Sequence, residues 1–234
     1  LNAIAHANEI CNMHGVDTIT CGATIAFAME CFEKGIIGFK ETGGLELRFG
    51  NPDAMLEVLD QIVTISGALG PILAQGSARA AKHWGSAAEE CLITVKNQEA
   101  PAHMPQAKRS LAVIYAVNPF GADHQSSEHD PMYEEGASDL YLTRLAELDL
   151  KDPPPPGSLS PEKVRFAAYS HIFYSILDTL ELCQFVWGPA WTLYGPSELV
   201  ELVQAVTGWE VSLYELIKVG ERRLNLMRVF NARE

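Results

Sequence analysis

The sequence lacks the signatures of several large functional classes. It contains no G-x-G-x-x-G, Walker, G-x-S-x-G or H-E-x-x-H motif, so nucleotide, acyl-serine and zincin chemistry have no local support. No apolar run approaches the roughly 20 residues that a membrane-spanning helix needs. Positive charge is scarce, because 17 Lys and Arg stand against 30 Asp and Glu, and the formal net charge is −13. So acidic a surface repels phosphates, which argues against binding to nucleic acid or to an anionic membrane.

Cysteine is sparse and has no paired spacing. Without a C-x-x-C pair, local spacing predicts neither a zinc ribbon nor a thioredoxin-like dithiol. The odd count and the apolar surroundings of most cysteines are typical of a reduced, cytoplasmic protein. Cys183 follows a predicted helix, where a thiolate could ligate a metal or simply pack. We expect the other four to be small buried hydrophobes: Cys11, Cys21, Cys31 and Cys91.

The sequence does contain a strong helical pattern. With 47% hydrophobic and 20% charged residues in 234 positions, the chain is globular and can bury a core. Apolar residues recur at helical spacing, and Gly, Pro or capping residues bound most of the periodic segments. The best strand candidate, 91–96, is short and isolated, so we expect a mostly α fold. The expected helices cover about 1–14, 22–34, 51 onward, 69–75, 77–84, 106–117, 138–148, 161–182, 196–207 and 211–230.

Neither end of the sequence has the features of a natural boundary. Leu1 begins within a helical pattern, without Met or a basic leader, and Glu234 is not preceded by a helix-ending Gly or Pro. We interpret both ends as cuts in a longer polypeptide. Within the chain, the proline-rich segment 151–158 predicts a stiff spacer.

Three places could carry chemistry. The segment Gly121–Asp130 combines imidazoles and carboxylates, which could bind a metal or relay a proton, or form a solvated acidic loop. His171, Ser175 and Asp178 share one face of an otherwise apolar predicted helix. Because unpaired polar burial is costly, they should bond to one another or to a ligand, unless this face is an exposed edge. Cys183 is the third place.

Six segments together resemble the C-terminal half of the tungsten-containing aldehyde:ferredoxin oxidoreductases. Each segment is modest alone, whereas six in this order are specific. The resemblance covers about 8–37, 51–125 and 160–234. The segments are Ala7–Thr18, Ala26–Gly35, Val95–His103, Gly121–His124, Asp178–Cys183 and Gly220–Arg233.

The resemblance implies a fold, a reaction and its cofactors. It implies two packed helical domains, with 1–100 as the C-terminal part of the second domain and 101–234 as a truncated third domain. The family oxidises aldehydes to carboxylic acids at a tungsten (or molybdenum) bispterin and passes electrons through a 4Fe-4S cluster to ferredoxin. Both cofactors also need an N-terminal part, because the β domain and the C-x-x-C-x-x-x-C run of the family are absent here. The resemblance therefore implies that this piece alone is inactive.

The resemblance also assigns site residues. Two D-x-x-G-L-[CD] motifs hold the two pterins, and the first matches Asn12-Met-His-Gly15-Val16-Asp17. The second matches Asp178-Thr-Leu-Glu181-Leu182-Cys183, which implies that Asp178 lies on a buried face as a pterin acceptor. Cys183 matches the fourth cluster thiolate, and His124 matches a histidine that bonds the substrate oxygen or relays a proton.

Two positions depart from the pattern and keep alternatives open. Asn12 replaces an Asp, and Glu181 replaces a Gly beside the cluster cysteine. One alternative is a tungsten-dependent reductase of another substrate, such as an aromatic-ring thioester, and the other is a cofactor-free helical scaffold subunit. The implied partners are a small aldehyde and ferredoxin or another low-potential carrier, with no nucleic acid and no membrane. The resemblance also allows a homodimer.

Overall fold

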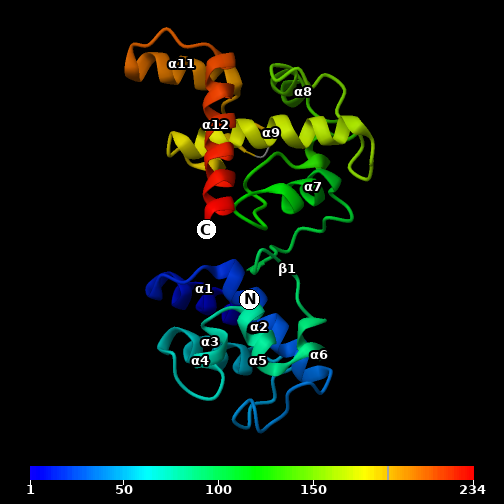
Figure 1. Ribbon diagram of the computed structural model, residues 1–234, viewed down its shortest axis with the longest axis vertical. Helices are drawn as coiled ribbons and strands as arrows, with labels where there is room; N and C mark the ends of the chain where they lie inside the picture. The colour runs from blue at the N-terminus through cyan, green and yellow to red at the C-terminus, as the bar shows by residue number, and fades with distance from the viewer. Residues whose placement is uncertain (189) are drawn as a thin grey trace. The chain divides into compact units, whose positions relative to one another are not determined.

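Helices dominate the computed structural model, which describes residues 1–188 and 190–234 (Figure 1). The chain divides into two units, Leu1–Pro101 and Ala102–Glu234, each with its own hydrophobic core. The described β structure is one two-stranded sheet, so the expected mostly α fold is confirmed. Within the described ranges, no helix is both long and apolar enough to cross a membrane.

The first unit is built mainly on α2, whose inward side chains lie at the centre of its core. This helix begins at Thr18, four residues earlier than expected, because the Asp17 carboxylate accepts a hydrogen bond from Thr20 N at 2.6 Å and caps it. The elements of this unit are α1 (Asn2–His14), α2 (Thr18–Glu33), α3 (Pro52–Thr64), α4 (Gly70–Leu73), α5 (Ser77–Trp84), α6 (Ser86–Glu89), β1 (Thr94–Val95) and β2 (Gln98–Glu99).

The expected strand at 91–96 is much shorter in the structure. Only Thr94 and Val95 form β1, which pairs antiparallel with β2 through Thr94 opposite Glu99. The chain reverses at Lys96 and Asn97, whose φ angles of 54° and 64° are typical of a two-residue hairpin turn. Cys91 and Leu92 are not β structure, because their N–H groups donate to Ala88 O and Glu89 O and continue the turn after α6.

The second unit is organised around α9, which packs against α7 and α12 (Figure 1). As expected from its apolar circumference, α9 is central, although it ends at Thr179 and not at 182. Gly220 lets α12 approach closely, because a Cβ there would overlap the backbone carbonyl of Ile172. The elements are α7 (Arg109–Val117), the 3-10 helix η1 (Asp130–Tyr133), α8 (Asp139–Ala146), α9 (Pro161–Thr179), α10 (Gln184–Trp187), α11 (Pro196–Thr207) and α12 (Leu213–Arg233).

The proline-rich segment is packed against helices. Pro154 O accepts a hydrogen bond from Lys163 Nζ at 2.9 Å, and Pro156 O accepts one from Arg109 N at 3.0 Å. Helix α7 therefore begins at Arg109, later than the expected 106. It ends before Asn118, and α12 holds this break through Asn231 Nδ2, which donates to Pro119 O at 2.7 Å.

Candidate functional site

The first motif forms the turn between α1 and α2. Gly15 has φ 67° and ψ 34°, a left-handed conformation, and ends α1. Val16 N donates to Cys11 O at 2.9 Å, which closes the turn, and Asp17 then caps α2. Asn12 is exposed, and its amide donates to Asn8 O at 2.8 Å. The turn thus presents polar side chains to solvent at its first and last positions.

The second motif has the same backbone turn after α9. Leu182 N donates to Leu177 O at 3.0 Å, as Val16 N does to Cys11 O. Glu181 has φ 55°, matching the left-handed Gly15 at the same motif position. Both motifs are therefore helix-ending turns of one kind, in which the fourth residue needs a positive φ. The two motifs share one residue spacing in the sequence. That spacing alone does not predict the positive φ of the fourth residue.

The conformation of Glu181 explains why glycine suits that motif position. A left-handed conformation brings the Cβ of an L-residue close to its own backbone, at a cost of about 1–2 kcal/mol that glycine avoids. Glu181 is exposed, so its charge remains solvated beside Cys183. The replacement of the motif's glycine by Glu181 therefore costs conformational energy and leaves the turn intact.

Asp178 is exposed, which corrects the expectation of a buried carboxylate. Its Oδ1 accepts a hydrogen bond from Gln184 Nε2 at 2.9 Å, and its Oδ2 lies 3.1 Å from Arg223 Nη1. The reason is its position at the last turn of α9, where the neighbouring α10 and α12 leave the carboxylate partly open to solvent. Each carboxylate oxygen has a second lone pair, so Asp178 can still accept hydrogen bonds from a ligand.

A polar cavity of about 330 Å³ adjoins Asp178 in the second unit. His171 and Ser175 are buried, as their place on α9 suggested, and Ser175 Oγ donates to Gly220 O at 3.2 Å. Burial raises the pKa of Asp123 above its ordinary value. The cavity is lined by Asn118, Phe120, Asp123, Ser126, His171, Ser175, Asp178, Arg223 and Met227.

His171 is the least satisfied polar group of this cavity. It is 7% exposed, and its Nε2 has no hydrogen-bond partner among the described residues. Burial, reinforced by the charges of Arg228 and Arg223, lowers the pKa of His171 to about 4. The ring is therefore neutral near pH 7, and Nε2 is a buried polar atom without a hydrogen-bond partner among the described residues.

His124 belongs to a cluster of three imidazoles around Lys108. Its ring stacks on His103 at 4.5 Å, and Lys108 Nζ lies 3.0 Å from His103 Nδ1 and 3.1 Å from His129 Nδ1. Burial lowers the pKa of His124, and the Lys108 charge adds to this, although Asp123 opposes it. Because the Gln125 amide nitrogen can only donate, His124 Nε2 accepts from it at 3.0 Å and Nδ1 carries the proton.

Two buried carboxylates fix the loop that carries these histidines. Glu128 accepts hydrogen bonds from Tyr133 OH at 2.9 Å, from Tyr174 OH and from Ala190 N at 2.8 Å. Asp130 accepts from Ser110 N at 3.0 Å and forms an ion pair with the buried Lys163. The segment Gly121–Asp130 therefore differs from a solvated acidic loop, because its Glu128 and Asp130 carboxylates are buried and hydrogen-bonded.

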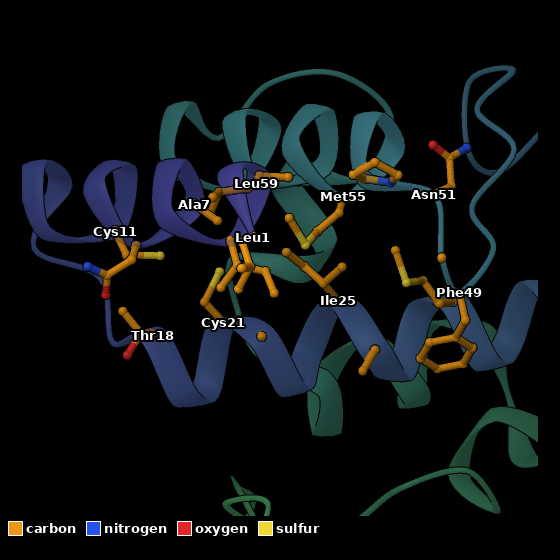
Figure 2. A pocket seen from close by; sticks show the side chains of 18 residues that line it. Leu1, Ala7, Cys11, Thr18, Cys21, Ile25, Phe49, Asn51, Met55 and Leu59 are labelled. Atoms are coloured by element: carbon orange, nitrogen blue, oxygen red, sulfur yellow. The ribbon is translucent and has the colours of Figure 1, made fainter.

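An apolar groove lies beside the first motif, between α1, α2 and α3. Its volume is about 580 Å³, and Figure 2 shows Cys11 and Cys21 at one end and Phe49 towards the other. Burial, with Cys11 in contact, raises the pKa of Cys21 to about 12, so this thiol stays protonated. Cys11, Cys21, Cys31 and Cys91 are buried as expected, whereas Cys183 is exposed.

The metal-binding capacity of the described residues is limited. They include no group of three or more His, Cys, Asp or Glu side chains placed to hold a metal ion. A 4Fe-4S cluster takes four thiolates, and only the Cys183 thiol is open to solvent. The chain therefore fits a cluster as the source of one ligand. It fits a pterin through the open acceptors of Asp178 and the exposed Asn12.

Comparison with known families shows to which family the chain belongs. A family model described as "Aldehyde ferredoxin oxidoreductase, domains 2 & 3" matches residues 1–234. The chain belongs to this family. The aldehyde ferredoxin oxidoreductase family is one of oxidoreductases, and the resemblance seen in the sequence is thereby confirmed.

Curated members of the aldehyde ferredoxin oxidoreductase family are similar over nearly the whole chain. Tungsten-containing aldehyde ferredoxin oxidoreductases from Pyrococcus horikoshii and Thermococcus kodakarensis are each 30% identical, over 99% of this chain and 35% of the relative. The "Aliphatic sulfonate oxidoreductase, WOR-like subunit" of Pyrococcus furiosus is 26% identical over 97% of this chain and 31% of that protein. The chain thus spans about a third of the length of its curated relatives.

A solved structure supports the fold. The active-site complex BamBC of benzoyl coenzyme A reductase, in complex with 1,5-dienoyl-CoA, aligns with a TM-score of 0.70 and 21% identity. The alignment covers 93% of this chain and 36% of that chain. This likeness confirms the helical fold of aldehyde ferredoxin oxidoreductase domains.

Sequence reasoning missed several residues around the site. His103 and Lys108 were given no role, although His103 lies in one of the segments that carried the resemblance, and Arg223 was not connected with Asp178. Their contacts join positions far apart in the chain, such as Lys108 with His129, so no local spacing predicts them. Within the second unit the structure groups His124 with Lys108, and Asp178 with Arg223. Asn12, Gly15, Val16 and Asp17 belong to the first unit.

Proposed function

We propose that this chain is part of an oxidoreductase that oxidises aldehydes to carboxylic acids at a tungsten-bispterin centre. Electrons would leave through a 4Fe-4S cluster to ferredoxin or another low-potential carrier. The observation that supports this most strongly is the repeated turn, in which Asn12 and Asp178 occupy equivalent exposed positions. We assign residues 1–100 to the second family domain and 101–234 to the third.

In this proposal the two turns hold the pterins. The Asp178 carboxylate accepts hydrogen bonds from ring N–H groups through its open lone pairs, while Arg223 and Gln184 fix its orientation. The Asn12 amide can both donate and accept at the equivalent position. The exposed Cys183 thiol supplies one thiolate to the cluster. When bound, the tungsten centre supplies the two-electron oxidation and the cluster carries single electrons.

His124 binds and orients the substrate oxygen. Its lowered pKa keeps the ring neutral near pH 7, and its Nδ1–H is the free donor because Nε2 accepts from Gln125. A proton taken up by this ring would bind Nε2 once the Gln125 amide has turned to present its oxygen as an acceptor. The anchors at Glu128 and Asp130 hold this loop and limit the motion of the ring.

The proposed function is tested by aldehyde-dependent reduction of ferredoxin in the anaerobic holoenzyme that contains this chain. We expect His124→Gln to lower kcat by about 10²–10⁴-fold, the range for losing a positioned acid–base group. Tungsten content should stay unchanged, because His124 is not assigned to the cofactor. His83→Gln is the matched control on an exposed histidine of α5.

The two alternatives predict other outcomes of the same assay. A reductase of another substrate, such as an aromatic-ring thioester, would contain tungsten but show no turnover with aldehydes. A scaffold subunit would contain no metal and would keep its role after Cys183→Ser. We also propose a cytoplasmic protein, which the five free cysteines support.

A further inference from the structure

Lys108 has an unusual place for a cation. It is the N-cap residue of α7, where the positive end of the helix dipole disfavours a positive side chain. Its side chain makes no capping hydrogen bond to the helix. A residue at odds with local stability in this way points to a function that its charge serves.

The ammonium group of Lys108 is surrounded by neutral acceptors. Because it can only donate, His103 Nδ1 and His129 Nδ1 must both accept, so both rings carry their proton on Nε2. The Nε2–H of His129 donates to His124 O at 2.9 Å and is therefore not available to a ligand. Burial and the Lys108 charge both lower the pKa of His103, to about 4, so the ring remains neutral.

Within the described ranges no carboxylate forms an ion pair with Lys108, in contrast to the nearby Lys163. Lys163 is almost fully buried and pairs directly with Asp130. Asp130 exerts some electrostatic influence on Lys108, but Ser110 and Lys163 already donate to it. The half-buried charge of Lys108 therefore lacks a direct counter-ion, and burial lowers its pKa.

We propose that Lys108 and His103 form an oxyanion-binding subsite for the carboxylate or sulfonate group of a small organic acid. Two donors remain for this ligand: the third N–H of the Lys108 ammonium and the Nε2–H of His103, for which the described part of the chain offers no partner. The first N–H groups of α7 already donate to Pro156 O and Asp130, so the donors for the anion come from Lys108 and His103. A local site is needed because the chain as a whole carries a net charge of −13 and repels anions.

The subsite deepens the proposed function, on which it rests for the role of the ligand. His103 stacks directly on His124, so an anion held here lies beside the ring assigned to the substrate oxygen. The ligand is then the anionic group of a substrate or of the carboxylate product. The subsite therefore favours a small substrate that carries its own anionic group, or assists retention of the carboxylate product.

The test is an NMR titration of histidine ring nitrogens at constant ionic strength. Sodium acetate, sodium methanesulfonate and the neutral isostere acetamide are added separately to the protein. We expect at least one anion to shift the His103 and His129 signals saturably, and acetamide to have no such effect. A response to acetate alone assigns a carboxylate ligand, and a response to methanesulfonate alone assigns a sulfonate.

Variants provide the matched comparison. Lys108→Met should raise the Kd of the anion at least tenfold, Lys108→Arg should retain binding, and Lys151→Met should leave it unchanged because Lys151 is exposed elsewhere. Equal binding of acetamide, unchanged binding in Lys108→Met, or no response to either anion would overturn the proposal. If Lys108→Met does not fold, the comparison of acetate with acetamide in the unmodified protein still decides. The titration measures binding and not turnover, so failure here is distinct from failure of aldehyde oxidation.

Discussion

The guanidinium of Arg223 lies 3.1 Å from the carboxylate of Asp178, and this ion pair joins α12 to the end of α9. Both side chains are about one-third exposed. The carboxylate that the family resemblance assigns to a pterin thus has a cationic partner of its own chain. The pair orients Asp178 and leaves open lone pairs on both oxygens.

We therefore expect Arg223→Met to have a small effect on stability. Partly exposed ion pairs contribute about 0–1 kcal/mol, because solvent screens the charges. The free energy of unfolding, measured by urea denaturation, should fall by no more than about 1 kcal/mol. Lys218→Met, which breaks the exposed pair with Glu221, is the control. A loss above about 3 kcal/mol would instead indicate a buried ion pair.

The equivalent turns predict opposite effects of reciprocal substitutions. Glu181→Gly should raise the free energy of unfolding by about 1 kcal/mol, because glycine adopts the left-handed conformation without a Cβ penalty. Gly15→Ala should lower it by about the same amount, since no atom lies within 4 Å of the added Cβ and only conformational strain remains. Equilibrium denaturation measures both. If Glu181→Gly destabilises the protein, the two turns are not equivalent.

The buried ion pair between Lys163 and Asp130 should be far more important for stability. Lys163→Met leaves Asp130 as an uncompensated buried charge, which typically costs about 3–5 kcal/mol. Arg165→Met breaks the exposed pair with Asp149 and should cost less than about 1 kcal/mol. Urea denaturation of the two variants side by side tests this contrast. Similar losses in both would contradict the assigned burial.

His171 predicts a pH dependence of stability. Its folded pKa of about 4 lies below its ordinary value of 6.5, so as pH falls the unfolded chain takes up the proton first. Stability is therefore lost between pH 6.5 and 4, by up to about 1.4 kcal/mol per pH unit. His171→Gln should reduce this slope. An unchanged slope in His171→Gln would show that folding does not lower the pKa of His171 and would contradict the prediction.

Much of the fold could be predicted from the sequence, because helical periodicity and caps act locally. The helix beginning at Pro161 and the break at Asn118 follow from Pro, Ser and Asn signals within a few residues. The strand predicted at 91–96 was too long, because Cys91 and Leu92 bond backward to the turn after α6 and only Thr94 and Val95 pair with β2.

The site could be predicted only in part. The family resemblance supplied the positions of His124, Asp178 and Cys183, but not their surroundings. The solvent exposure of Asp178 depends on where α9 ends relative to α12, and the cluster around Lys108 joins residues 103, 108 and 129. Such tertiary contacts have no signature in one sequence.

The central claim is that Cys183 and the two turns serve a tungsten and iron–sulfur enzyme. The most direct measurement is elemental analysis for tungsten, molybdenum and iron in the anaerobically purified holoenzyme and in its Cys183→Ser and Cys91→Ser variants. We expect about one tungsten (or molybdenum) and four irons per chain, with iron lost in Cys183→Ser and kept in Cys91→Ser, whose thiol is buried. A holoenzyme without these metals, or undiminished iron in Cys183→Ser, would contradict the claim.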